Sequence, residues 1–121
     1  YWTTARKYKL ENMPFGTAVQ FEVVGPGVQG NPMGLTNLQG RLFGAFVRLN
    51  GQWTRLSRKQ FPATEMPLAR EIPVEQRPHT ADELRKLAAI QYPNGWHGEG
   101  VVVRAVDQTW SFKVINLDYK N

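Results

Sequence analysis

Two apolar stretches near the end of the chain predict a β-hairpin. Residues 99–104 read Glu-Gly-Val-Val-Val-Arg, and residues 111–116 read Ser-Phe-Lys-Val-Ile-Asn. The short polar segment 105–108 lies between them, and two β-prone runs separated by a short polar turn are typical of antiparallel partners. We therefore expect a hairpin in this part of the chain.

The second strand of this hairpin has two different faces. Because side chains alternate along a strand, Trp110, Phe112 and Val114 share an apolar face and Lys113 lies on the other. If the register pairs residue 99 with residue 113, Glu99 and Lys113 share one surface. A carboxylate suited to a metal ion and an ammonium group suited to a phosphate would then form one site.

The first half of the chain shows the same alternation. In the first predicted strand, Gln20 and Glu22 interrupt an apolar series, which places them together on a polar face. The Asn50-Gly51 pair is a strong hairpin signal. The strands predicted here cover residues 18–24, 41–49 and 52–56, and a turn-rich loop follows the first of them over residues 25–32.

Helical signals occur at two places. Residues 1–11 carry apolar side chains at helical spacing. Thr80 followed by Glu83 is a capping-box pattern, which predicts a helix to about residue 90 with Leu84, Leu87 and Ala88 facing inward. The proline-rich segment 61–79 cannot form one long helix and is expected to be a connector, with a short strand over 71–74 as an option.

These elements predict the α+β class, with mostly antiparallel sheets and flanking helices. The 121 residues suffice for one domain, and the net charge of +5 favours polyanionic partners. The chain has no cysteine and no apolar run of membrane-spanning length, so we expect no thiolate metal site and a cytoplasmic location without a membrane partner. The opening Tyr1-Trp2 resembles the interior of a longer protein, and we expect a fragment.

The ordered set of motifs resembles the adenylyltransferase domain of ATP-dependent RNA ligases, in the covalent nucleotidyltransferase superfamily. The matching blocks resemble the helix before motif III and motifs III, IIIa, IV and V; they are residues 1–8, 18–31, 41–46, 99–104 and 111–113. The resemblance implies a partial nucleotidyltransferase (ATP-grasp-like ligase) fold. It also implies that residues 1–121 are the C-terminal portion of the domain.

The resemblance implies a reaction as well. In this family a lysine attacks ATP to form lysyl-AMP, AMP passes to an RNA 5′-phosphate, and an RNA 3′-hydroxyl displaces it, with Mg²⁺ or Mn²⁺ assisting. The attacking lysine belongs to a Lys-x-Asp-Gly motif, which this chain lacks. By the family's order that motif precedes Tyr1. We expect the chain alone not to form lysyl-AMP and to need an upstream lysine-bearing segment.

The resemblance assigns roles to four residues. Glu22 would contact the ribose, Phe46 would stack on adenine with Gly44 leaving room for a purine, and Glu99 would bind metal and act in catalysis. Lys113 would contact the α-phosphate and also act in catalysis. A lysine among apolar neighbours is costly to bury unpaired, and a phosphate or Glu99 would offset that cost.

Three positions depart from the family pattern. Phe21 replaces a usual glycine, Val47 replaces a frequent aspartate after the aromatic residue, and Ile115 replaces a second lysine found in some RNA ligases. The alternatives for three of the site residues are ordinary ones: a surface charge for Glu22, a strand-edge charge for Glu99 and a core aromatic for Phe46.

Other interpretations stay open. The chain is either part of a ligase, a non-catalytic nucleotide- or RNA-binding module, or a structural domain that keeps only the fold; a DNA ligase or capping enzyme is a further option within the superfamily. We expect Arg41, Arg48 and Arg104 to be solvated, although they are able to contact RNA phosphates. Trp96 is interpreted either as a lid over the nucleotide or as packing against the sheet.

Overall fold

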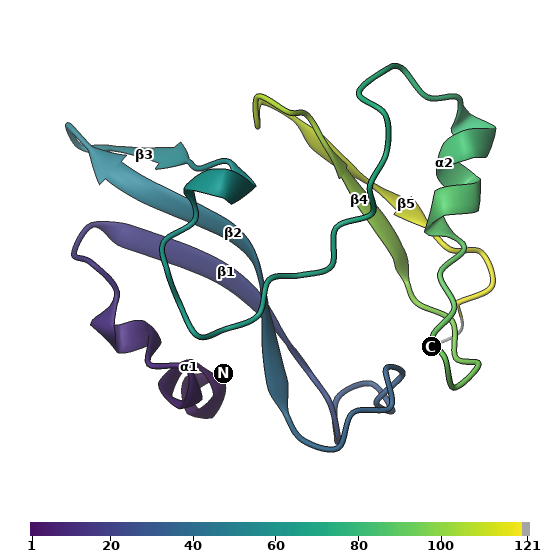
Figure 1. The fold of residues 1–121 in the computed structure, drawn as a ribbon, viewed down its shortest axis with the longest axis horizontal. Helices are drawn as coiled ribbons and strands as arrows, with labels where there is room; N and C mark the ends of the chain where they lie inside the picture. The colour runs from purple at the N-terminus through teal and green to yellow at the C-terminus, as the bar shows by residue number, and fades with distance from the viewer. Residues whose placement is uncertain (120–121) are drawn as a thin grey trace.

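A computed structural model describes residues 1–119 and contains two antiparallel sheets (Figure 1). The first is three-stranded, in the order β1 (Thr17–Val24), β2 (Gln39–Leu49) and β3 (Gln52–Arg55). The second pairs β4 (Gly100–Arg104) with β5 (Ser111–Ile115). Mostly antiparallel sheets with few helices confirm the α+β class.

The helices are short and lie around the sheets. They are α1 (Trp2–Lys7), η1 (Leu10–Asn12), η2 (Arg58–Gln60) and α2 (Ala81–Ala88). Figure 1 shows α2 packed on the side of the β4–β5 hairpin that faces away from the three-stranded sheet. Among residues 1–119, no helix is long and apolar enough to cross a membrane.

The tight turn between β2 and β3 confirms the hairpin that the sequence predicted. Asn50 and Gly51 both have positive φ angles, 50° and 78°, as the turn of a two-residue hairpin requires. In the β1–β2 pair, Glu22 lies opposite Arg41, and the register shifts at Gln20. Gln20 and Glu22 lie two residues apart and share the exposed side of β1, as alternation along a strand predicts.

The proline-rich connector does not form the optional strand over residues 71–74. Instead, the backbone of Leu42 on β2 bonds to the segment around Leu68: its N–H donates to Pro67 at 2.9 Å, and its carbonyl accepts from Ala69 at 2.7 Å. A proline carbonyl accepts normally, whereas Pro73 has no N–H to offer a ladder. The contact therefore forms earlier in the connector than expected.

The core is small and lies mainly behind β2. Leu42 and Ala45 are fully buried, and Met66 is almost so. Gly40 on β2 has no room for a side chain, since a Cβ atom there would approach the Met66 sulfur to 2.9 Å. Thr4 of α1 lies against the same glycine, so α1 and Met66 cover this side of the sheet and leave the side that carries Glu22 free.

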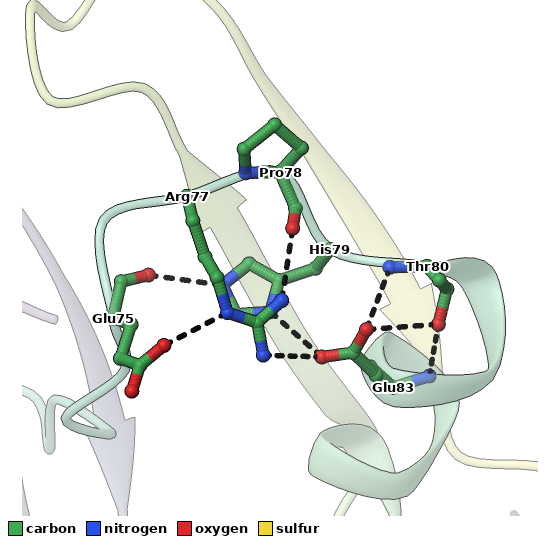
Figure 2. Close-up of polar contacts among 6 residues, drawn as sticks. All are labelled: Glu75, Arg77, Pro78, His79, Thr80 and Glu83. Atoms are coloured by element: carbon green, nitrogen blue, oxygen red, sulfur yellow. Dashed lines mark hydrogen bonds and ion pairs between the residues drawn. The ribbon is translucent and has the colours of Figure 1, made fainter.

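The capping box at the start of α2 is present as predicted. The Glu83 N–H donates to the Thr80 hydroxyl at 3.2 Å, and the Thr80 N–H donates to the Glu83 carboxylate at 3.3 Å (Figure 2). Ala88 is buried and Leu84 and Leu87 are half-buried, which confirms the inward face. The helix ends at Ala88, slightly before the expected end.

The register of the last hairpin differs from the one considered above. Lys113 pairs with Val102, and the N–H of Asn116 donates to the carbonyl of Glu99 at 2.8 Å. The hairpin closes where the N–H of Ala105 donates to the carbonyl of Trp110 at 3.0 Å. This closing contact determines which residues of β4 and β5 lie opposite each other along the rest of the hairpin. The proposed pairing of residues 99 and 113 is therefore wrong.

Candidate functional site

Despite the different register, four charged side chains from both sheets lie near one another; Glu22, Arg41, Glu99 and Lys113 are called the charged cluster below. Burial raises the pKa of Glu22, and the negative charge of Glu99 raises it further. The positive charges of Arg41 and Lys113 act in the opposite direction on the same carboxyl. The fold thus brings Glu99 and Lys113 near enough to Glu22 for their charges to act on its carboxyl.

Lys113 is available to a ligand. Its side chain is exposed on β5, and it forms no ion pair with a carboxylate among residues 1–119. As the alternation along the strand predicted, Phe112 and Val114 lie on the other face, and no burial cost has to be offset at Lys113 because its side chain is exposed. Its positive charge lies near enough to Glu22 to lower the pKa of that carboxyl.

Backbone constraints on both sides position Glu99. Asn116 is buried, and its side-chain amide donates to the carbonyls of Gly98 at 2.9 Å and Ile90 at 3.1 Å. Gly100 has a φ of 140°, and a Cβ atom at this position would collide with the carbonyl oxygen of Val114. The glycine that follows Glu99 is therefore required by close backbone approach at the start of β4.

Two tyrosines near the glutamates were not predicted from the sequence. Desolvation raises the pKa of Tyr92, and the charges of Glu22 and Glu99 raise it further. The pKa of Tyr119 is raised by desolvation and then by Glu99. The two hydroxyls come from the loop after α2 and from the segment after β5. No sequence motif linked them to the glutamates.

The carboxylates fit a hard divalent cation held jointly with a ligand. Glu22 and Glu99 supply oxygen donors, and Mg²⁺ is usually bound by one or two carboxylates together with substrate phosphates and water. Within residues 1–119, no group of three or more His, Cys, Asp and Glu side chains is arranged to hold a metal by itself. The site therefore fits a metal that arrives with phosphate oxygens rather than a closed structural metal centre.

Phe46 lies farther along β2 and has a cation above its ring. Phe46 pairs with Arg55 across the β2–β3 hairpin, and the guanidinium carbon lies 5.0 Å from the ring centroid. Gly44 does not leave an open space for a purine, as the sequence suggested. A Cβ atom there would lie 2.5 Å from the Gln20 amide oxygen and 2.9 Å from an Arg55 nitrogen, so these two side chains occupy that space.

A cavity of about 650 Å³ lies near Glu99, because Tyr119, whose pKa Glu99 raises, is one of the residues that line it. The loop after β1 and the loop before β4 enclose it, together with the segment after β5 that carries Tyr119. Trp96 lines this cavity, and its ring atoms lie 3.3 Å from the Cβ position of Gly30. Trp96 thus contacts the loop after β1.

The comparisons with known proteins locate this arrangement among solved folds. No protein-family model matches the chain, and no curated protein matches its sequence. The solved structure of Naegleria gruberi RNA ligase with pyrophosphate matches with a TM-score of 0.69 and 25% identity, over 95% of this chain. A lysine-to-alanine variant of the same ligase, solved with ATP and manganese, matches with a TM-score of 0.65 and 24% identity over the same share.

The chain has the fold of an RNA ligase. This confirms the resemblance to ATP-dependent RNA ligases and the partial nucleotidyltransferase fold. The chain spans 38% of the length of each matched ligase, so it corresponds to a part of such a protein. In this RNA ligase fold the charged cluster comes from both sheets, and Phe46 lies on the first.

Proposed function

We propose that the chain is part of an ATP-dependent RNA ligase in which it binds the nucleotide and the metal during nucleotidyl transfer. The observation that carries the proposal is the charged cluster, in which Glu22 on β1, Glu99 just before β4 and Lys113 on β5 lie near one another in an RNA ligase fold. A structure of the matched ligase holds ATP and manganese, which supports the same ligand class here.

In the proposed complex, Lys113 contacts the α-phosphate and Glu22 accepts hydrogen bonds from the ribose hydroxyls. Glu99 would hold Mg²⁺ or Mn²⁺ together with phosphate oxygens, and the metal would supply positive charge at the phosphates. A carboxylate is an acceptor only, which suits ribose hydroxyls and a cation, whereas an ammonium group is a donor only, which suits phosphate.

The proposed role is positioning and charge neutralisation. In the transfer step, a lysine nitrogen bonds to the α-phosphorus, the bond to the β-phosphate oxygen breaks, and pyrophosphate leaves. Negative charge develops on the phosphate oxygens, and a fixed cation such as Lys113 stabilises it. Because the chain has no Lys-x-Asp-Gly motif, we propose that a segment of the longer protein upstream of Tyr1 supplies the nucleophile.

Phe46 is proposed to stack on the adenine. The ring is half-buried on the side of the sheet that carries Glu22, and stacking on an aromatic ring contributes about 1–3 kcal/mol per base. Arg55 covers this ring in the structure, so a base that stacks there either displaces the guanidinium or is sandwiched beneath it. RNA with 5′-phosphate and 3′-hydroxyl ends is the proposed second substrate.

The test is calorimetric titration of the chain with ATP and Mg²⁺. Lys113→Ala should weaken binding about tenfold or more, since a charge-assisted hydrogen bond contributes about 1.5–3 kcal/mol. Lys86→Ala is the matched control, because Lys86 is an exposed lysine on α2, on the other side of the hairpin. Equal affinities of the two variants would overturn the assignment of Lys113.

The absence of the nucleophile motif favours a second candidate, a nucleotide- or RNA-binding module without catalysis. The ligase part and the binding module are distinguished by adding a segment that carries the nucleophilic lysine. Mixing the chain with ATP and an upstream segment from a complete ligase should restore covalent AMP transfer if the chain is a ligase part. Binding without any transfer would favour the binding module, and covalent labelling of the chain alone would contradict both.

A further inference from the structure

The β2–β3 hairpin presents two aromatic rings and two guanidinium groups on one face of the sheet. Phe46 lies opposite Arg55, and Arg48 lies opposite Trp53. Because residues directly opposite each other share a face and side chains alternate along each strand, all four side chains lie on the same side. Aromatic and cationic side chains therefore alternate along both strands and across the pair.

This face of the hairpin continues the side of the sheet that belongs to the charged cluster. Arg55 donates to the amide oxygen of Gln20 at 3.4 Å, and Gln20 shares the exposed side of β1 with Glu22. Arg55 also lies over the ring of Phe46. The other two residues of the set lie nearer the turn of the hairpin. The four side chains thus lead from the proposed nucleotide site towards the tip of the hairpin.

The outer pair, Arg48 and Trp53, is open to a ligand. Arg48 is exposed, and the Trp53 side chain keeps 53% of its surface exposed. Within residues 1–119, neither Arg48 nor Arg55 forms an ion pair with a carboxylate. A guanidinium group has five N–H donors in a fixed fork, and the bond to Gln20 uses only one of those of Arg55. An exposed indole beside two such cations suits an anion that also carries a flat ring.

We propose that Arg48, Trp53 and Arg55, called the hairpin platform below, bind a single strand of RNA. One base stacks on the Trp53 indole, and the two guanidinium groups beside it bond to the phosphates of the strand. Proteins that bind single strands combine aromatic rings for the bases with basic side chains for the backbone. The platform deepens the proposed function, on which it rests for RNA as the ligand, and it leaves Phe46 to the adenine of ATP.

The chemistry of the hairpin platform favours a single strand over a duplex or an acidic protein. Bases inside a duplex already stack on one another, whereas unpaired bases are free to stack on an aromatic side chain. An acidic peptide would pair with the two arginines but leave the indole without a flat partner. The net charge of +5 suits the polyanionic backbone of a strand.

The experiment measures binding of a short fluorescent oligoribonucleotide, by anisotropy over a range of salt concentrations. Trp53→Ala should weaken binding about tenfold without changing the salt dependence, because it removes a stacked base and no phosphate contact. Arg48→Gln should weaken binding by a similar factor and reduce the log–log salt slope by about 0.7, because one phosphate contact to a single strand is lost. Trp53→Phe should retain most of the affinity, since a phenyl ring also stacks.

The matched controls are Trp2→Ala and Arg6→Gln, which remove the same side chains from exposed positions on α1. The α1 helix lies on the covered side of the sheet, so both controls should keep the affinity and the slope close to the wild-type values. Circular dichroism and thermal unfolding of every variant separate a binding defect from a folding defect. If Trp53→Ala and Arg48→Gln bind the oligonucleotide as these controls do, the hairpin platform does not bind RNA.

A duplex probe tests the stacking step directly. A blunt RNA duplex that contains the same strand should bind more weakly than the strand alone, and its affinity should not depend on Trp53. A duplex that binds as tightly as the strand, with affinity lost only in Arg48→Gln, would show charge attraction without stacking and would overturn the platform.

Calorimetry with ATP on the same variants separates the platform from the proposed function. ATP binding that requires Lys113, together with RNA binding that depends on neither Trp53 nor Arg48, overturns the platform and leaves the proposed function intact. RNA binding that requires Trp53 and Arg48 in a chain that does not bind ATP supports the platform and overturns the proposed function. A folded wild-type chain that binds neither ATP nor the oligonucleotide overturns both.

Discussion

The side-chain amide of Asn116 donates a hydrogen bond to the carbonyl of Gly98 at 2.9 Å. The same amide donates to Ile90 at 3.1 Å, while the backbone N–H of Asn116 donates to the carbonyl of Glu99 at 2.8 Å. One buried residue at the end of β5 therefore joins the chain after α2 to the residues that open β4. Through these bonds Asn116 acts as a positioning residue for Glu99.

Asn116→Ala should destabilise the chain by about 1–3 kcal/mol, because two carbonyls lose their amide donor in a buried environment. The measurement is the free energy of unfolding from urea denaturation. Asn12→Ala is the control: Asn12 is exposed, and its replacement should change this free energy by no more than about 0.5 kcal/mol. Similar losses for the two variants would show that the Asn116 bonds contribute nothing specific.

Gly100→Ala should destabilise the chain more than a glycine substitution at another position with positive φ. Gly100 has a φ of 140° and lies where a Cβ atom would collide with the carbonyl oxygen of Val114. Gly95 has a φ of 88° with open space around its Cβ position, so Gly95→Ala measures the conformational cost alone, about 1–2 kcal/mol. Thermal unfolding compares the two. A smaller loss at position 100 would contradict the role of close backbone approach.

Glu22→Gln should stabilise the fold at neutral pH while it weakens nucleotide binding. Burial and Glu99 raise the pKa of Glu22 above 4.5, so the native state holds this proton more tightly than the unfolded chain. Stability from this group is complete below about pH 4.5 and falls as the pH rises through the folded-state pKa. The neutral amide avoids that loss but is a weaker acceptor for ribose hydroxyls.

The measurement is the thermal midpoint at several pH values, beside calorimetry with ATP. Glu22→Gln should raise the midpoint only above the folded-state pKa of Glu22. Glu11→Gln serves as the control, since Glu11 is exposed and has no ion-pair partner among residues 1–119. A lower midpoint for Glu22→Gln at neutral pH would mean that Arg41 and Lys113 outweigh desolvation and Glu99.

Local signals in the sequence predicted the features that depend on a few adjacent residues. The Asn50-Gly51 turn and the Thr80 capping box follow from backbone preferences and hydrogen bonds within four residues, and both are present. The register of the β4–β5 hairpin depends instead on how the chain turns between Ala105 and Trp110. No residue of that turn has a preference strong enough to determine it, and the predicted register was wrong.

The candidate site shows the same division. The motif resemblance selected Glu22 and Lys113, and the structure brings them together although they are far apart in the sequence. The position of Arg55 over Phe46 depends on which strand lies beside β2. Alternation along a strand gives the face on which a residue lies but not its neighbours on other strands. The sequence alone therefore does not predict such contacts.

The last prediction concerns the acid side of the pH range and the start of α2. Figure 2 shows Arg77 between Glu75 and Glu83, with Arg77 nitrogens 2.9 Å and 2.7 Å from their carboxylates. The bond from Arg77, followed by the bonds from Thr80, lowers the pKa of Glu83 from 4.5 to about 2. Because this pKa is lowered, the contribution of Glu83 to stability is present above pH 4.5 and lost as the pH falls towards about 2.

Arg77→Gln should therefore move the pKa of Glu83 back towards 4.5, so that the start of α2 loses its cap at a higher pH than in the wild-type chain. The measurement is an NMR titration of the Glu83 carboxyl carbon together with circular dichroism through the acid range. Arg85→Gln is the matched control, because Arg85 pairs with Asp82 on the same helix and does not contact Glu83. If both variants leave the Glu83 titration at its wild-type position, the backbone and hydroxyl of Thr80 hold the carboxylate without help from Arg77.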